Sequence, residues 1–81
     1  MRVKVLLFAR LREIVGAGAV ELDLPPQATA ADAYAALAGA ATGLTEMRPR
    51  VRCAVGPEYA AWDAVLSDGV ELAFIPPTAG G

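Results

Sequence analysis

The last residues of the sequence constrain the chain more than any other stretch. They read Pro-Pro-Thr-Ala-Gly-Gly and follow the run 70–75, whose apolar residues alternate as in a core strand. Glycine has no Cβ, so Gly80 and Gly81 form the narrowest backbone that a protein can present. Pro76 and Pro77 fix φ and favour extended geometry in the residues that precede them. The sequence predicts a slim, semi-stiff segment over 76–81, able to reach roughly 20 Å beyond the last strand.

Short apolar runs with a two-residue period predict the strands of one sheet. We expect strands at 3–9, 19–24, 50–55 and 70–75, with a weaker edge strand or loop at 58–62. The inward residues should be Val3, Val5, Leu7, Val20, Leu22, Leu24, Val51, Cys53, Val55, Leu72 and Phe74. Tyr59 and Trp62 should lie half-buried against the sheet.

A helix is expected over 28–41, where apolar residues repeat at three- and four-residue spacing. Thr29 is the expected N-cap, and Asp32 places a carboxylate at the helix N-terminus. Gly39 should weaken this helix and Gly43 should end it. One or two helical turns are expected over 10–15 and a short turn over 44–48.

The order of these elements is strand, strand, helix, strand, weak strand, strand. If the first and last strands are adjacent, they must be parallel, which is the β-grasp arrangement. The predicted fold class is therefore α+β, a ubiquitin-like β-grasp with a mixed sheet of four to five strands packed on one main helix. The length suits a single domain over 1–81, with 76–81 as its extended C-terminal segment.

The first strand places two large apolar side chains, Leu6 and Phe8, on its nominally outer face. Either a loop covers them as a second layer of core, or they form a docking surface. If the first and last strands are neighbours, Leu6, Phe8, Ala73 and Ile75 form one exposed apolar patch beside the segment 76–81. This expectation favours docking of a partner.

The composition excludes several kinds of chemistry. The chain has no histidine, which removes histidine-based catalysis and histidine metal ligation. Its one cysteine, Cys53, allows no internal disulfide and should be a small buried hydrophobe. A net charge of −2 disfavours nucleic acid and a membrane surface as partners. We expect a soluble, cytoplasmic protein with no metal and no permanently bound cofactor.

By elimination, the reactive group should be the α-carboxylate of Gly81. It is ionised at neutral pH and is a poor electrophile. Another protein must therefore activate it, and we expect activation with ATP to an acyl-adenylate, after which a sulfur nucleophile could form a thiocarboxylate. Side chains at the last two positions would obstruct the narrow channel of such an enzyme, so glycine fits there for a steric reason.

The two ends of the chain carry a family resemblance. Residues 66–81, LSDGVELAFIPPTAGG, resemble the ending of the small subunit of molybdopterin synthase (MoaD), and residues 3–16, VKVLLFARLREIVG, resemble its opening. The length and the order of elements agree throughout.

The resemblance implies a β-grasp sulfur carrier whose terminal glycine, here Gly81, is adenylated by an E1-like enzyme and then thiocarboxylated. It implies that Pro76, Pro77, Thr78, Ala79 and Gly80 insert into the large synthase subunit, in a heterotetramer. There the tail donates sulfur to cyclic pyranopterin monophosphate, building the dithiolene of molybdopterin. A cysteine desulfurase or a rhodanese-type protein would supply the sulfur.

Three other functions stay open. The chain could carry sulfur for thiamine, cysteine or tRNA thiolation, since such carriers share the fold and the Gly-Gly end. It could be a ubiquitin-like modifier joined to target lysines. It could also be an interaction domain with an inert tail. In each case the domain itself has no independent catalytic side chains.

Overall fold

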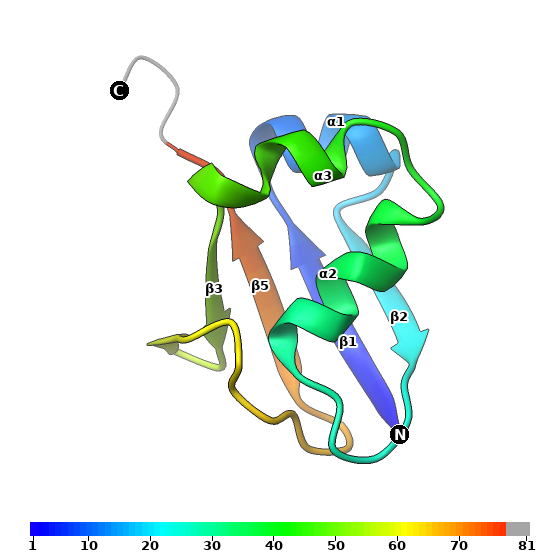
Figure 1. Cartoon of the computed structure of the whole chain (residues 1–81), viewed down its shortest axis with the longest axis vertical. Coiled ribbons are helices and arrows are strands. Elements are labelled where there is room, and N and C mark those ends of the chain that lie inside the picture. The colour runs from blue at the N-terminus through cyan, green and yellow to red at the C-terminus, as the bar shows by residue number, and fades with distance from the viewer. Residues whose placement is uncertain (78–81) are drawn as a thin grey trace.

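The computed structural model describes residues 1–77, and its centre is a five-stranded mixed sheet in the order β2-β1-β5-β3-β4 (Figure 1). The strands are β1 (Arg2–Leu7), β2 (Ala19–Asp23), β3 (Arg52–Val55), β4 (Glu58–Ala60) and β5 (Glu71–Ile75). β1 and β5 are adjacent and parallel, and all other neighbours are antiparallel. The predicted pairing of the first and last strands, and with it the β-grasp arrangement, is confirmed.

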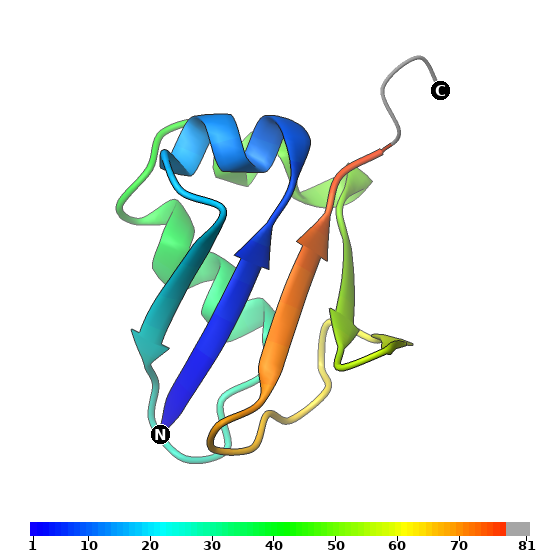
Figure 2. The ribbon, with the colours of Figure 1, turned by 180° about the vertical axis from the view of Figure 1, so that it is seen from behind.

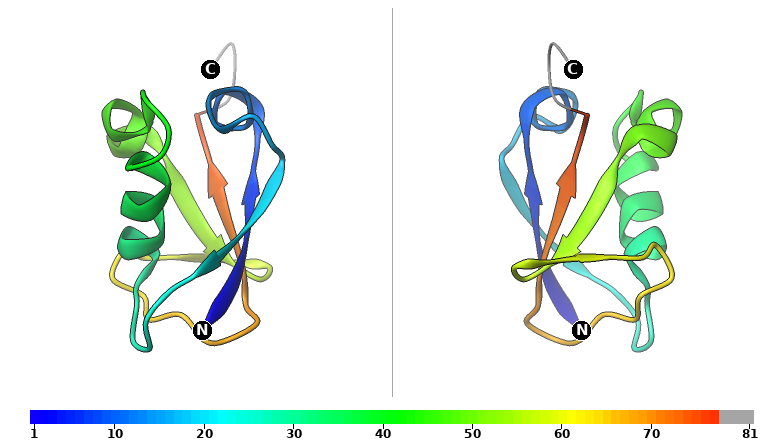
Figure 3. Two further views of the ribbon diagram at one scale, coloured as in Figure 1. Left: turned by 90° about the vertical axis from the view of Figure 1, so that its right-hand side faces the viewer. Right: turned by 90° about the vertical axis from the view of Figure 1, so that its left-hand side faces the viewer.

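The helices leave one face of this sheet bare. They are α1 (Ala9–Val15), α2 (Ala30–Ala38), α3 (Leu44–Met47) and the 3₁₀ helix η1 (Arg48–Arg50). α2 and α3 lie on one side of the sheet, and α1 lies at the end where β1 and β5 finish (Figure 3). Seen from behind, the sheet has no helix in front of it (Figure 2). Within residues 1–77, none of these helices is long and apolar enough to cross a membrane.

Local chemistry explains where α2 begins and ends. The Thr29 hydroxyl accepts a hydrogen bond from the Asp32 amide at 3.2 Å, and the Asp32 carboxylate accepts one from the Thr29 amide at 2.9 Å. This capping box confirms the predicted start. The predicted end was wrong, because α2 stops at Ala38 with Gly39 as its C-cap. Glycine disfavours a helix more than any residue except proline, so α2 ends at Gly39. Gly43, at φ 105°, is instead the N-cap of α3.

Three aromatic rings join α2 to the strand that leads to the chain's end. The Tyr34 ring meets Phe74 and Trp62 edge-on at centroid distances of 5.0 and 5.3 Å, and Trp62 stacks on Phe74 at 5.8 Å. The Tyr34 hydroxyl donates to the Leu44 carbonyl at 2.6 Å. Around them, the inward residues of β1 and β5 are fully buried, as predicted. The cluster therefore anchors β5 immediately before it leaves the sheet.

Three sequence predictions need correction. The first strand ends at Leu7, because Ala9 already begins α1. The third begins at Arg52 rather than at position 50, because residues 48–50 form η1, with Pro49 in its first turn. Tyr59 is 70% exposed rather than half-buried, because it lies on the edge strand β4 and on the bare face of the sheet. Trp62 is half-buried as predicted.

The buried Cys53 thiol and Tyr34 phenol make the stability of the fold depend on pH in the alkaline range. Burial raises the pKa of the Cys53 thiol and of the Tyr34 phenol, and nearby Arg48 offsets part of each rise. Both groups stay protonated in the folded chain at pH values where the unfolded chain begins to lose those protons. The unfolded state then binds fewer protons, so stability is full below the ordinary thiol pKa of 9.0 and falls as pH rises above it.

We therefore expect the urea midpoint to fall between about pH 8 and about pH 10.5. The fall should be smaller for Cys53→Ala, which has no thiol to ionise, although that variant starts from lower stability. Equal pH dependence of the two proteins would contradict a contribution from Cys53.

Candidate functional site at the end of β5

The chain leaves the sheet at one well-anchored point. Phe74 is fully buried, Ile75 and Pro76 are half-buried, and Pro77 is exposed. This exit lies at the end of the sheet next to α1 and η1 (Figure 2). Of the segment expected to insert into a partner, Pro76 and Pro77 are thus placed at the surface. The predictions for Thr78, Ala79, Gly80 and Gly81 lie outside the described residues.

Three of the four residues expected to form an apolar patch lie on the bare face of the sheet, and the fourth, Phe8, follows the end of β1. Leu6 and Ala73 are register partners across β1 and β5, and Ile75 pairs with Arg52 on β3. Leu6, Ala73 and Ile75 are half-buried. Phe8, which has extended backbone and precedes α1, is 46% exposed. No element of residues 1–77 covers this outer apolar patch. Docking of a partner on this patch stays a prediction.

The apolar surface extends further across the sheet than the sequence suggested. Ala73 pairs with Ala54 on β3, and Ala54 pairs with Tyr59 on β4. Ala54 is only 8% exposed, so the exposed part of this extension is Tyr59. Register partners point to the same face, so Tyr59 continues the row that starts at Leu6. Sequence reasoning missed this extension, although the alternation of β3 placed Ala54 opposite the inward Cys53 and Val55.

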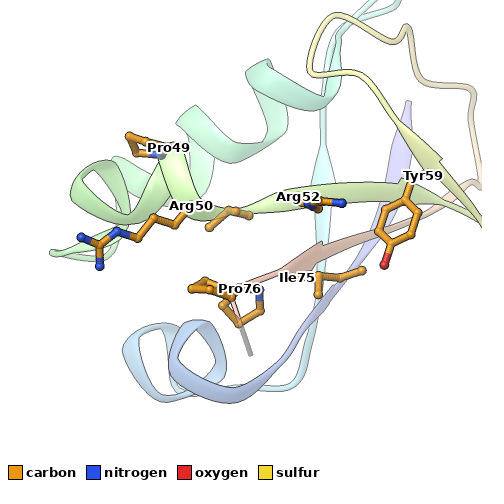
Figure 4. A pocket seen from close by; sticks show the side chains of 8 residues that line it. Pro49, Arg50, Arg52, Tyr59, Ile75 and Pro76 are labelled. Atoms are coloured by element: carbon orange, nitrogen blue, oxygen red, sulfur yellow. The ribbon is translucent and has the colours of Figure 1, made fainter. Parts of the chain in front are cut away.

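A pocket of about 530 Å³ lies beside the exit of β5, between the start of β3 and the first residues after β5. Figure 4 shows its side chains, contributed by η1, β3, β4, the last residue of β5 and residues 76–77. Its lining consists of Pro49, Arg50, Val51, Arg52, Tyr59, Ile75, Pro76 and Pro77. Sequence reasoning did not find this pocket, because its walls come from segments about 25 residues apart.

The rim of this pocket is positively charged. Arg50 and Arg52 are exposed, as predicted, and the Arg52 guanidinium carbon lies 5.9 Å from the centre of the Tyr59 ring. Arg48 points elsewhere, since its guanidinium carbon lies 4.3 Å from the Trp62 ring. Within residues 1–77, the salt bridges are made by Arg2 and Arg10, not by these three arginines.

Cys53 is held in a setting that does not favour reaction of its thiol. Cys53 is 1% exposed, its thiol donates to the Ala60 carbonyl at 3.2 Å, and burial raises its pKa, all of which oppose nucleophilic reactivity. Residues 1–77 contain no group of three histidine, cysteine or acidic side chains that could hold a metal. The pocket and the apolar residues beside the exit of β5 are the surface features that a partner could contact.

Comparison with known sequences gives concordant matches along the chain. The sequence model of the ThiS family matches residues 5–81. The molybdopterin synthase sulfur carrier subunit of Arabidopsis thaliana is 37% identical over 81 residues, covering 100% of this chain and 84% of that protein. The subunit of the same name from Escherichia coli (strain K12) is 35% identical over 80 residues, covering 98% and 99%.

Solved structures show the same fold. SAMP1, the small archaeal modifier protein 1 of Haloferax volcanii, superimposes with a TM-score of 0.85 at 32% identity, over 100% of both chains. A protein–protein complex of subunits 1 and 2 of the molybdopterin-converting factor from Helicobacter pylori contains a chain with a TM-score of 0.66 at 21% identity, again over the full length of both. At that identity the likeness concerns the fold alone.

Proposed function

Because this chain belongs to the ThiS family, we propose that it is the sulfur carrier subunit of a molybdopterin synthase. The observation that carries the proposal is the sequence identity of this chain, 37% and 35% along nearly its whole length, to two proteins of that name. The family alone does not select a pathway. The names of these relatives favour molybdopterin over thiamine, cysteine or tRNA thiolation.

The reactive group in this proposal is the α-carboxylate of Gly81. An E1-like enzyme joins it to the AMP moiety of ATP and releases pyrophosphate. The terminal sulfur of a persulfide on a cysteine desulfurase or rhodanese-type donor then attacks the acyl-adenylate and displaces AMP. A thiol cleaves the resulting acyl disulfide by exchange, leaving a thiocarboxylate on Gly81 and a disulfide between the donor and the thiol. Gly80 and Gly81 suit this reaction because neither places a Cβ where the tail must enter a narrow channel.

The loaded tail then enters the large synthase subunit and gives its sulfur to cyclic pyranopterin monophosphate. A dithiolene contains two sulfur atoms and each tail carries one, so each product consumes two loaded carriers. The large subunit supplies the catalytic side chains. The body of this chain contributes the anchored exit at Phe74 and the outer apolar patch, which hold the tail against its partner.

Intact mass spectrometry tests this function. The protein is incubated with ATP, a sulfur source and the E1-like enzyme of the same organism. Exchange of one terminal oxygen for sulfur supports a carrier, and formation of molybdopterin after addition of the large subunit and the pyranopterin assigns the pathway. An unchanged mass, with the enzyme shown to be active, would contradict the proposal.

A second candidate is a ubiquitin-like protein modifier. The observation in its favour is the full-length match to SAMP1 at 32% identity. The same activated Gly81 could form an isopeptide bond with a target lysine. In the mass assay this function would appear as a ladder of conjugates on added protein rather than as an oxygen-for-sulfur exchange.

Phe8→Asp should weaken binding to the large subunit by at least about 10-fold, because a charge would be buried in the outer apolar patch. The free energy of unfolding should change by less than about 1 kcal/mol, since Phe8 is already 46% exposed. Calorimetric titration and urea unfolding measure the two effects. Val65→Asp is the matched control, because Val65 is 58% exposed and belongs to the loop that pairs with Thr29. Greater damage to folding than to binding would place Phe8 in the core.

A further inference from the structure

We infer that the pocket beside the exit of β5 binds an acidic segment of the protein that receives the tail, with Arg50 and Arg52 pairing with its carboxylates. This inference rests on the proposed function, because it names the partner's chemistry at the same site. It concerns the basic rim, Arg50 and Arg52, which lies beside the outer apolar patch and is not part of it.

The charge distribution is the first argument. The chain carries nine acidic and seven basic residues, yet Arg48, Arg50 and Arg52 fall within five positions. Arg48 stacks over Trp62, which leaves the other two at the pocket. Within residues 1–77, neither Arg50 nor Arg52 forms a salt bridge. On a chain with a net charge of −2, this is a local positive site that the described part of the molecule does not neutralise.

The chemistry of the lining selects the ligand. A guanidinium presents a planar fork of donors that matches a carboxylate, and it remains charged at every physiological pH. Beside the guanidinium groups, the exposed Tyr59 ring and the apolar side chains of Ile75 and Pro76 can contact the CH₂ groups of the peptide's side chains. A volume of about 530 Å³ accommodates several side chains rather than one small anion.

Continuity with the outer apolar patch is the third argument. Ile75 belongs both to that patch and to the pocket lining, and Arg52 is its register partner on β3. A protein that covers the patch and accepts the tail beyond Pro77 therefore passes over the pocket. Figure 4 shows Arg52 and Tyr59 on the β3–β4 side of the opening, with Ile75 and Pro76 opposite. Acidic residues on such a protein would meet Arg50 and Arg52.

The test compares binding of the large synthase subunit to the wild type and to the double variant Arg50→Gln and Arg52→Gln. Calorimetric titration is performed at low and at moderate salt. We expect Kd to rise about 10-fold or more at low salt, and the salt dependence to become shallower, because two charge pairs are lost. Replacing both residues with lysine should recover only part of the affinity, since lysine keeps the charge but not the fork.

Arg2→Gln is the matched control, because it removes a positive charge from the far end of β1. Arg2 already pairs with Glu21 at 2.8 Å, on the edge away from the pocket. Thermal unfolding of each variant checks that the fold is intact. An equal loss of affinity in Arg2→Gln would mean that net charge, not the pocket, governs binding, and would overturn the inference.

Three further results would overturn it. Unchanged affinity of the double variant, with tight binding by the wild type, would refute the pocket inference and leave the proposed function standing. Binding of inorganic phosphate by the wild type but not by the double variant, with unchanged partner affinity, would assign the pocket to a phosphate ligand. Absence of wild-type binding to the large subunit would instead refute the proposed function, and the pocket inference with it.

Discussion

Deletion of Gly81 is expected to abolish thiocarboxylate formation while leaving the stability of the domain nearly unchanged. Removing one extended residue draws the terminal carboxylate back by roughly 3.5 Å, and a reacting group displaced by only about 1 Å can lose about 100-fold in rate. We therefore expect a loss of at least about 100-fold in the rate of sulfur loading. The core residues of the described chain, from Val3 to Phe74, are untouched by this deletion.

Intact mass spectrometry measures the loading, and thermal unfolding measures stability. Arg2→Gln serves as the control, because it alters a surface side chain at the opposite end of β1 and should load normally. A variant that loads sulfur at the wild-type rate would refute Gly81 as the reactive residue. A fall of many degrees in the melting temperature would show that the last residue supports the fold.

Replacing Phe74 with alanine is expected to remove a third or more of the domain's stability. Its side chain is fully buried, and its ring contacts both Tyr34 and Trp62. Truncation of a buried phenylalanine costs about 3–5 kcal/mol, and a domain of this size has a total stability of roughly 5–10 kcal/mol. The same truncation also loosens the point from which the tail emerges, so partner binding should fall together with the fold.

Urea unfolding followed by tryptophan fluorescence measures this effect, since Trp62 stacks on the ring that is removed. Phe8→Ala is the matched control, because Phe8 is the same residue type on the surface and should cost less than about 1 kcal/mol. Equal destabilisation by the two substitutions would contradict the assignment of Phe74 to the core and of Phe8 to the outer apolar patch.

Several features of the fold could be predicted because they depend on neighbours in the sequence. The two-residue period assigned Val3, Val5, Leu72 and Phe74 to the interior, and all four are buried. The spacing of Thr29 and Asp32 identified the capping box at the start of α2. The end of α2 was harder to predict than its start, because local propensity alone allows the helix to stop at either Gly39 or Gly43.

The family match also follows from the sequence alone, since the opening and the ending of the chain carry its motifs. The membership of the outer apolar patch was predicted on one condition, that the first and last strands are neighbours. The structure supplies that condition through the parallel pairing of β1 with β5.

The pocket and its basic rim were decided only by the tertiary structure. Arg52 faces Ile75, and Tyr59 continues the apolar row, because β3 lies between β5 and β4 in the sheet. Alternation states which face a side chain occupies, but it contains no information about which distant strand lies beside it. That choice depends on how the whole sheet closes over α2, so residues far apart in the chain meet at the exit of β5 only after folding.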